Sequence, residues 1–192
     1  MLASRMNLPN ILTLARIGMS VVFVAVLSFT WPHAFGVGFI LFLAASLTDF
    51  LDGYLARKHN QVTDFGKLMD PLADKILVSA AMVLLAVERF LPAWFVILIL
   101  FREFLVTGVR MLALGNRVVI AADIWGKLKT IAQIVLVCLI LGREGLHEMN
   151  WHAVANWALW EWARVFFYYA TLVTTVLSGV LYLRTFLKHG EL

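Results

Sequence analysis

The sequence predicts an all-α integral membrane protein with six transmembrane helices and a short N-terminal segment along the membrane interface. Hydrophobic residues make up 62% of the 192-residue chain, against about 45–50% in soluble domains, and they gather in six long runs. A helix needs about 20 apolar residues to cross the hydrocarbon of a bilayer. A membrane β-barrel is excluded because the runs are too long and do not alternate between apolar and polar residues.

The six runs follow one another along a chain that we interpret as a single domain, residues 1–192. We expect the first helix to begin near Pro9 and to be retained, because no small-residue cleavage pattern follows its apolar run. The fifth run is short, and its helix is expected to begin inside a water-filled recess. The expected spans are residues 8–30, 34–56, 71–87, 91–114, 127–141 and 163–187.

The basic residues predict the orientation of these spans. Six crossings place both termini, the second-to-third loop and the fourth-to-fifth loop on one side. That side carries twelve lysines and arginines, whereas the other carries Arg89, Arg143 and Arg164. Cytoplasmic loops are the ones enriched in Lys and Arg, so we expect the first side to face the cytoplasm of a bacterial inner membrane. Six of the seven tryptophans fall near the opposite interface, which is typical of an aromatic belt.

The net charge of +4 indicates an anionic lipid or anionic substrate, because nucleic acid is the least probable partner for a membrane chain.

Four aspartates gather where the second predicted helix ends and the third begins. The second helix carries two of them beside two residues with almost no side chain, at i, i+3, i+4 and i+7: Asp49, Asp52, Gly53 and Ala56. The third carries a set spaced by four: Gly66, Asp70 and Asp74. Each spacing places its residues on one helix face. A short loop makes the two helices antiparallel neighbours, so we expect the four carboxylates to converge.

Four converging carboxylates need a counter-charge. An ionised aspartate in a bilayer costs about 2.5–3.5 kcal/mol on insertion scales, and four like charges also repel. Two divalent cations would balance them, and all-oxygen ligation favours Mg²⁺ or Mn²⁺ over zinc. The alternative is that the aspartates cap helices and pair with nearby cations: Arg57, Lys58, Lys67 and Lys75.

The complete pattern D-x2-D-G-x2-A-R-x8-G-x3-D-x3-D, from Asp49 to Asp74, resembles the motif of the CDP-alcohol phosphotransferase family. These enzymes transfer a phosphate-bearing alcohol from a CDP-alcohol to a second alcohol and release CMP. Three flanking segments are similar to those of the bacterial phosphatidylglycerophosphate synthases of this family: Asn7–Arg16, Arg102–Arg110 and Gly126–Thr130.

The resemblance implies CDP-diacylglycerol and sn-glycerol 3-phosphate as substrates, phosphatidylglycerophosphate and CMP as products, and a homodimer. It implies that Asp49, Asp52 and Asp70 bind the metals, and that Asp74 serves as base, ligand or both. It assigns contacts with the cytidine nucleotide to Gly53, Ala56, Arg57 and Gly66. Three further residues are expected to line the lipid-nucleotide side: Asn10, Thr13 and Arg16.

The phosphate of the acceptor requires a cationic pocket, and Arg102 is the first candidate. An arginine in the middle of an apolar helix is costly and is usually functional; the alternative is an internal pair with Glu103. Arg110 lies about 80° further round the same helix. Lys127 and Lys129 begin the fifth helix and are further candidates for binding the acceptor phosphate. The alternative role for these two lysines is contact with anionic lipid.

Three other functions remain open at this point. The nearest is the same family with another acceptor, such as inositol phosphate, serine, choline or phosphatidylglycerol. An intramembrane prenyltransferase is expected to carry two separated Asp-rich motifs on more helices than six. A divalent-cation transporter is expected to place its acids near the midplane on broken helices.

Overall fold

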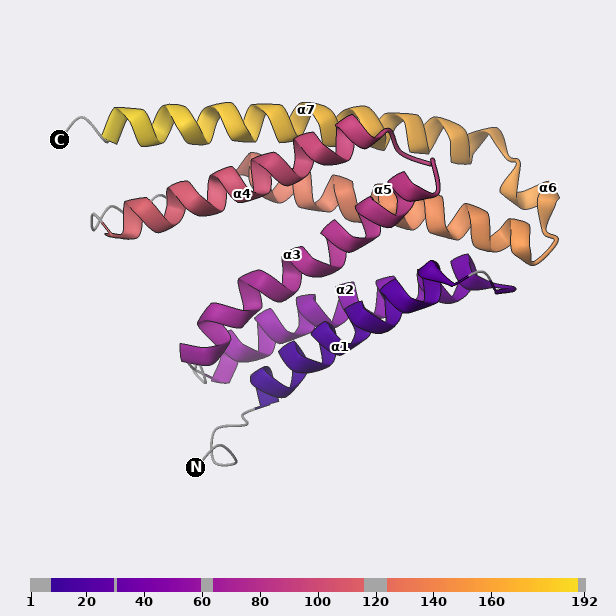
Figure 1. Cartoon of the computed structure of the whole chain (residues 1–192), viewed down its shortest axis with the longest axis horizontal. Coiled ribbons are helices and arrows are strands. Elements are labelled where there is room, and N and C mark those ends of the chain that lie inside the picture. The colour runs from indigo at the N-terminus through magenta and orange to yellow at the C-terminus, as the bar shows by residue number, and fades with distance from the viewer. Residues whose placement is uncertain (1–7, 30, 60–63, 116–123, 190–192) are drawn as a thin grey trace. The chain divides into compact units, whose positions relative to one another are not determined.

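The computed structural model describes residues 8–29, 31–59, 64–115 and 124–189, and the side chains of residues 14–29, 31–48, 75–110 and 124–187. All regular secondary structure in these ranges is helical, so the all-α prediction is confirmed (Figure 1). The helices are α1 (Leu8–Ser28), α2 (Ala34–His59), α3 (Asp64–Val87), α4 (Ala93–Gly115), α5 (Ile124–Glu148), α6 (His152–Ala155) and α7 (Ala158–His189).

Several helix ends differ from the prediction. The fifth helix is 25 residues long, because it begins at Ile124, before the expected start, and continues past the apolar run through residues 142–148, most of which are compatible with a helix. α3 begins at Asp64. Proline is best tolerated in the first turn of a helix, but Pro71 lies beyond the first turn of α3. The last helix, α7, begins at Ala158, ahead of the expected start at residue 163, and the short α6 precedes it.

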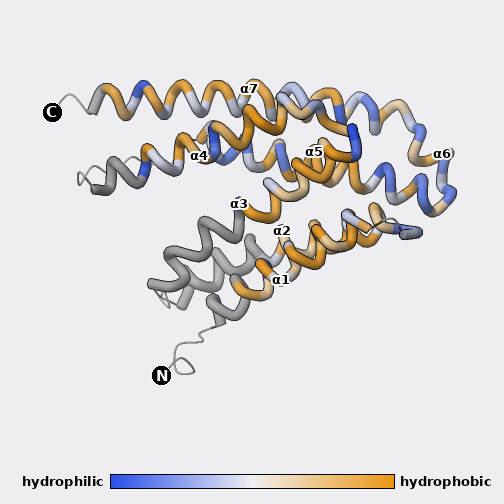
Figure 2. Tube along the Cα trace, in the orientation of Figure 1, coloured by the Kyte–Doolittle hydropathy of each residue, from blue (hydrophilic) through white to orange (hydrophobic). Residues whose placement is uncertain are grey.

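Two described helices are long and apolar enough to cross a membrane, namely Ile124–Glu148 and the first 30 residues of α7, Ala158–Leu187. Shorter apolar stretches occupy parts of α1, α2 and α3, at Leu14–Ser28, Ala34–Thr48 and Lys75–Val87. Figure 2 shows these apolar stretches along the trace. Six transmembrane helices therefore remain a prediction.

The chain forms two compact units, and the first comprises residues 1–84 and 140–157. In this unit α1 packs against α2, and the rings of Phe23 and Phe42 lie 5.8 Å apart at their centroids. α2 and α5 approach each other closely at Gly36 and Gly145. A Cβ added to Gly145 would lie only 2.8 Å from the Gly36 Cα. The Glu148 carboxylate accepts hydrogen bonds from the Phe35 and Gly36 amides, which satisfies donors at the α2 N-terminus.

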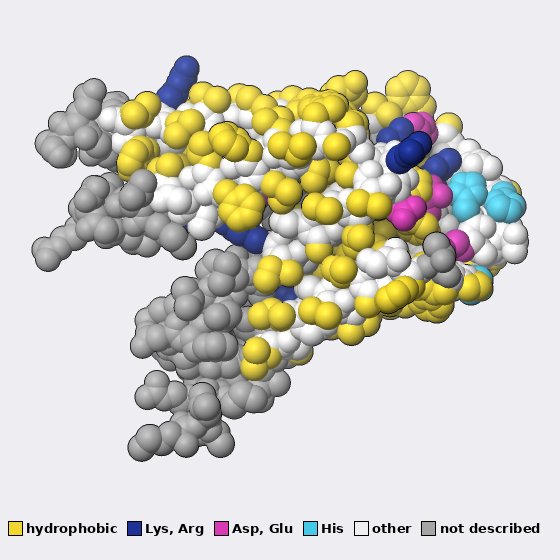
Figure 3. Space-filling view, viewed as in Figure 1, with side chains coloured by type: hydrophobic (Ala, Val, Ile, Leu, Met, Phe, Trp, Pro, Cys, Tyr) yellow, Lys and Arg dark blue, Asp and Glu magenta, His cyan; other side chains and the backbone are white. Residues whose placement is uncertain are grey.

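The second unit comprises residues 85–139 and 158–192. Here α4 packs against α7, and Phe95 stacks on Tyr168 with ring centroids 4.4 Å apart. Ile97, Phe101 and Phe104 are exposed along α4 at the i, i+4, i+7 spacing of one helix face. Figure 3 shows hydrophobic side chains over much of the visible surface of α4 and α7. An exposed apolar stripe of this kind is typical of a surface that contacts lipid or a partner.

Candidate functional site

The aspartate motif lies in helical backbone on both of its sides. α2 is helical from Asp49 through Arg57, and α3 from Gly66 through Asp74. The i, i+3, i+4 and i+7 relations therefore hold as helical spacings, and residues 60–63 separate the two helices. The aspartate side chains lie outside the described set, so their convergence stays a prediction. Among the side chains that are described, no group of three His, Cys, Asp or Glu could hold a metal ion.

The residues expected to contact CDP-diacylglycerol fall on the first three helices. Gly53, Ala56 and Arg57 lie in α2, Gly66 in α3, and Asn10 and Thr13 in α1; their side chains are outside the described set. Arg16 is the exception. Its side chain is buried in α1, with 2% of its surface exposed, and its carbonyl accepts a hydrogen bond from Ser20 Oγ. A buried guanidinium is expensive unless it is compensated, so its position favours a specific role.

Arg102 lies at the centre of a polar cluster within the second unit. Its Nη1 donates to Glu103 Oε1 at 3.0 Å, and its Nε donates to Ser178 Oγ on α7, also at 3.0 Å. Lys129 on α5 donates to the same Glu103 oxygen. The cluster therefore links α4, α5 and α7 through one carboxylate and one guanidinium.

Two glycines leave space for the Arg102 side chain. A Cβ on Gly126 would lie 3.4 Å from Arg102 Nη2, and a Cβ on Gly179 would lie 3.4 Å from Arg102 Cγ. The backbones of α5 and α7 thus approach the arginine from two directions. Small residues permit such close approach between helices.

The four cations predicted to bind the acceptor phosphate differ in burial. Arg102 is 12% exposed and Lys129 only 2%, and the structure brings these two together through Glu103. Arg110 and Lys127 are exposed and take no part in the described hydrogen bonds of the cluster. The alternative pairing of Arg102 with Glu103 is present, but it occurs together with contacts to two further helices.

Ser178 is the member of the cluster that the sequence analysis did not identify. It is a small hydroxyl residue inside the apolar run of α7, and it is 1% exposed. Its Oγ also donates to the Thr175 carbonyl, so its lone pairs remain able to accept from Arg102. A polar residue at the centre of an apolar helix was the available signal.

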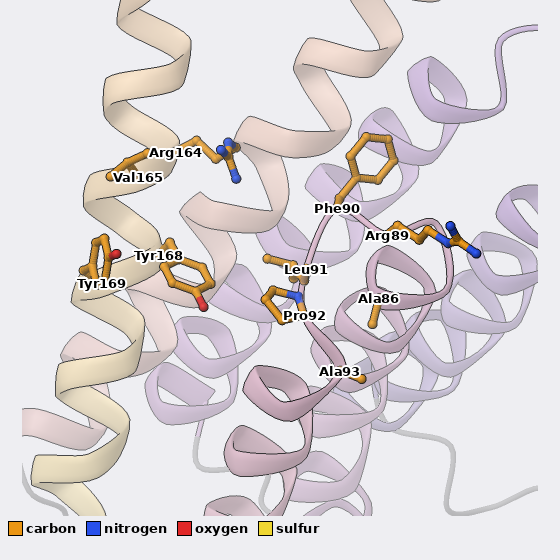
Figure 4. Close-up of a pocket in the computed structure, with 10 residues that line it drawn as sticks. All are labelled: Ala86, Arg89, Phe90, Leu91, Pro92, Ala93, Arg164, Val165, Tyr168 and Tyr169. Carbon is orange, nitrogen blue, oxygen red and sulfur yellow. The ribbon is translucent and has the colours of Figure 1, made fainter.

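A separate cavity of about 580 Å³ opens between the α3–α4 turn and α7. Its walls are Ala86, residues 89–93, and Arg164, Val165, Tyr168 and Tyr169. Figure 4 shows Tyr168 directed toward Leu91 and Pro92. None of the residues predicted from the sequence to form the site lines this cavity, so we do not assign the predicted chemistry to it.

Comparison with known proteins gives one consistent result. The family model described as CDP-alcohol phosphatidyltransferase matches residues 6–180. A Bacillus subtilis protein named CDP-diacylglycerol–glycerol-3-phosphate 3-phosphatidyltransferase is 45% identical over 185 residues, covering 90% of this chain and 91% of the relative. Proteins of the same name from Rickettsia bellii (41% identical, 80% and 86% covered) and Salmonella paratyphi A (36%, 92% and 93%) are also similar.

Proposed function

This chain belongs to the CDP-alcohol phosphatidyltransferase family, and we propose that it transfers the phosphatidyl group of CDP-diacylglycerol to sn-glycerol 3-phosphate. The products are phosphatidylglycerophosphate and CMP. The observation that carries the choice of acceptor is the name shared by relatives that are 36–45% identical over most of both chains. The cationic cluster around Arg102 supports an acceptor that carries phosphate.

The donor set of the aspartate motif fits hard divalent cations. Members of this family generally depend on divalent cations, and four carboxylates from α2 and α3 supply only oxygen ligands. We propose that Asp49, Asp52 and Asp70 hold two such ions, Mg²⁺ or Mn²⁺, with Asp74 as an additional ligand. When bound, these ions would stabilise negative charge on the pyrophosphate of the substrate and on the departing CMP.

We propose that Asp74 takes the proton from the attacking hydroxyl of glycerol 3-phosphate. The hydroxyl oxygen then forms a bond to the phosphorus that carries diacylglycerol, and the bond from that phosphorus to the CMP oxygen breaks. The proton ends on the Asp74 carboxylate, and the electron pair of the broken bond leaves with CMP. This is a direct in-line displacement that requires no covalent enzyme intermediate.

The remaining motif residues hold the nucleotide and the lipid. Gly53, Ala56 and Gly66 carry little or no side chain, which leaves room for a flat cytidine against the helix backbones. Arg57 supplies a cation for the nucleotide. We place Asn10, Thr13 and the buried Arg16 along the lipid-nucleotide side.

We propose that Arg102 binds the phosphate of the acceptor directly. A guanidinium presents several N–H donors in one plane and can pair bidentately with phosphate oxygens. Arg110 and Lys127, which are exposed, add positive charge that attracts a dianion. An acceptor without phosphate, such as serine, would make no use of this charge.

We infer that the enzyme is a multi-pass protein of the bacterial cytoplasmic membrane and acts as a homodimer. The apolar helices and the bacterial relatives support the location. The excess of lysine and arginine in the loops supports six spans with both termini and the active site on the cytoplasmic side. Family membership sets aside the prenyltransferase and cation-transporter hypotheses.

The test uses purified protein in detergent with CDP-diacylglycerol and radiolabelled glycerol 3-phosphate. We expect label to enter lipid only with Mg²⁺ or Mn²⁺, and incorporation to fall at least about a thousandfold in Asp70→Asn, because a metal ligand is lost. Thermal unfolding of both proteins provides the control for folding. Transfer to inositol phosphate or serine but not to glycerol 3-phosphate would refute the proposed acceptor and leave the family assignment unchanged.

A further inference from the structure

We propose that Glu103 is a positioning residue for this reaction: its carboxylate orients the Arg102 guanidinium to receive the phosphate of the acceptor. The inference rests on the proposed function, which assigns that phosphate to Arg102. Glu103 itself does not touch the substrate, because it acts through the arginine.

The first support is that one oxygen of Glu103 serves two cations. Oε1 accepts from Arg102 Nη1 at 3.0 Å and also from Lys129 Nζ. Two positive groups repel at such short range unless an anion lies between them. The carboxylate therefore makes it possible for a cation of α4 and a cation of α5 to approach one another.

The second support is the way in which the plane of the guanidinium is fixed. Glu103 holds the Nη1 end, and Ser178 holds Nε at 3.0 Å. The guanidinium is rigid and planar, so two held positions define the directions of its other N–H bonds. Recognition of a phosphate by two parallel hydrogen bonds requires such a defined plane.

The third support is the difference in burial between the two cations. Arg102 keeps 12% of its side chain exposed, whereas Lys129 keeps 2%. The lysine is therefore enclosed and secures the carboxylate, and the arginine is the member that remains within reach of a ligand. Lys129 contributes to acceptor binding by anchoring Glu103.

A purely structural role for Glu103 is the competing explanation, in which it only neutralises the buried Lys129. Charge-matched variants separate the two roles. Arg102, Glu103 and Lys129 together carry a net charge of +1, and E103M/K129M also leaves +1, on Arg102 alone. The variant replaces a buried ion pair by unbranched apolar side chains, a change that proteins often tolerate. The electrostatic attraction to the acceptor is held constant, while the support for the guanidinium is removed.

The experiment measures kcat and both KM values for wild type, K129M, E103M/K129M and E103Q/K129M in detergent. We expect E103M/K129M to raise the KM for glycerol 3-phosphate about tenfold, the size of effect of one charge-assisted hydrogen bond. The KM for CDP-diacylglycerol is expected to stay within about twofold. E103Q/K129M is expected to restore part of the loss, because its amide oxygen accepts from Arg102. K129M keeps the Arg102–Glu103 pair but removes the anchor of the carboxylate, so it is expected to raise the KM for glycerol 3-phosphate about threefold, less than E103M/K129M does.

The matched control is Glu144→Gln, which breaks an Arg–Glu pair of the same dipeptide type, Arg143–Glu144, and is expected to leave both KM values unchanged. A folded E103M/K129M with the wild-type acceptor KM would overturn the proposal. If the double variants fail to fold, Glu103→Asp decides: it keeps the charge beside Lys129 but shortens the side chain, so a native acceptor KM refutes positioning and a raised one supports it. Failure of the proposed function is recognised separately, because wild type itself would then not transfer to glycerol 3-phosphate.

Discussion

The chain contains two Arg–Glu dipeptides with the same internal ion pair but different surroundings. Arg102 Nη1 lies 3.0 Å from Glu103 Oε1, and Arg143 Nη1 lies 2.9 Å from Glu144 Oε1. The first pair is joined to α5 through Lys129 and to α7 through Ser178. In the second, Arg143 Nε donates to the Ala155 carbonyl at 3.3 Å, close by in the chain.

Burial separates the two arginines further. Arg143 is 31% exposed and Arg102 is 12% exposed. An arginine near a helix end can extend its charge toward water, whereas an arginine in the middle of an apolar helix must find its partners inside the protein. The dipeptide alone therefore does not reveal its role; the helix position and the third partner do. The following predictions test this difference, beginning with the largest expected effect.

Loss of the Glu103 charge should affect stability far more than loss of the Glu144 charge. Glu103→Gln removes the carboxylate from the nearly enclosed Lys129, and breaking a buried ion pair costs about 3–5 kcal/mol. Glu144→Gln breaks a more exposed pair, which is worth about 0–1 kcal/mol. Denaturant unfolding in detergent measures both. Equal losses would show that the two pairs are energetically equivalent.

Replacing Arg102 should weaken acceptor binding, whereas replacing Arg143 should not. Arg102→Ala is expected to raise the KM for glycerol 3-phosphate about 10- to 100-fold, because charge-assisted hydrogen bonds to phosphate are worth about 1.5–3 kcal/mol. Arg143→Ala is expected to leave this KM within about twofold. Steady-state kinetics at saturating CDP-diacylglycerol provides the comparison. A similar rise in both variants would remove the special role of Arg102.

The glycines beside the two pairs should respond differently to an added methyl group. Gly145→Ala places its Cβ 2.8 Å from the Gly36 Cα, where backbone cannot easily move, and overpacking costs about 1–3 kcal/mol. Gly126→Ala places its Cβ 3.4 Å from Arg102 Nη2, at the end of a long side chain. We expect little loss of stability there, but a rise of about two- to fivefold in the acceptor KM, because the guanidinium shifts. Thermal unfolding and kinetics of both variants test this contrast.

The smallest effect is expected at Ser178. Ser178→Ala removes the acceptor of Arg102 Nε, a single hydrogen bond that contributes about 1 kcal/mol, so the KM for glycerol 3-phosphate should rise about threefold. Ser20→Ala, which also removes a buried hydroxyl from an apolar helix, is the control with no expected change. An unchanged KM in Ser178→Ala would leave Glu103 as the main support of the guanidinium.

The sequence predicted the helical fold and the unusual arginine, because both follow from local hydrophobicity. Apolar runs marked each long helix, and a charge within such a run drew attention to Arg102. Helix ends were less predictable, since polar residues of adequate helix propensity carry α5 on to Glu148. The apolar run of the third helix began only at residue 71, whereas α3 begins at Asp64 and continues through Pro71, although proline usually lies in a first turn.

The cluster around Arg102 could be predicted only in part. Glu103 was available as its sequence neighbour, but the approach of Lys129 and Ser178 depends on tertiary packing between helices that are far apart in the chain. Periodicity identifies residues that share one helix face; it does not identify which face meets which neighbour. For the aspartates, the spacing defines the faces on α2 and α3, and their convergence remains a prediction that rests on these faces and on the short connection between the two helices.

The most direct test of the account is CMP release in a single turnover at high enzyme concentration, with Mg²⁺ and CDP-diacylglycerol present. In-line transfer assisted by Asp74 predicts CMP release only when glycerol 3-phosphate is added, with one CMP for each lipid product. Asp74→Asn should slow this step by a factor of about 100 to 10,000, the usual contribution of a general base. A burst of CMP equal to the enzyme concentration without any acceptor would contradict direct transfer, and no CMP release with any acceptor would contradict the function itself.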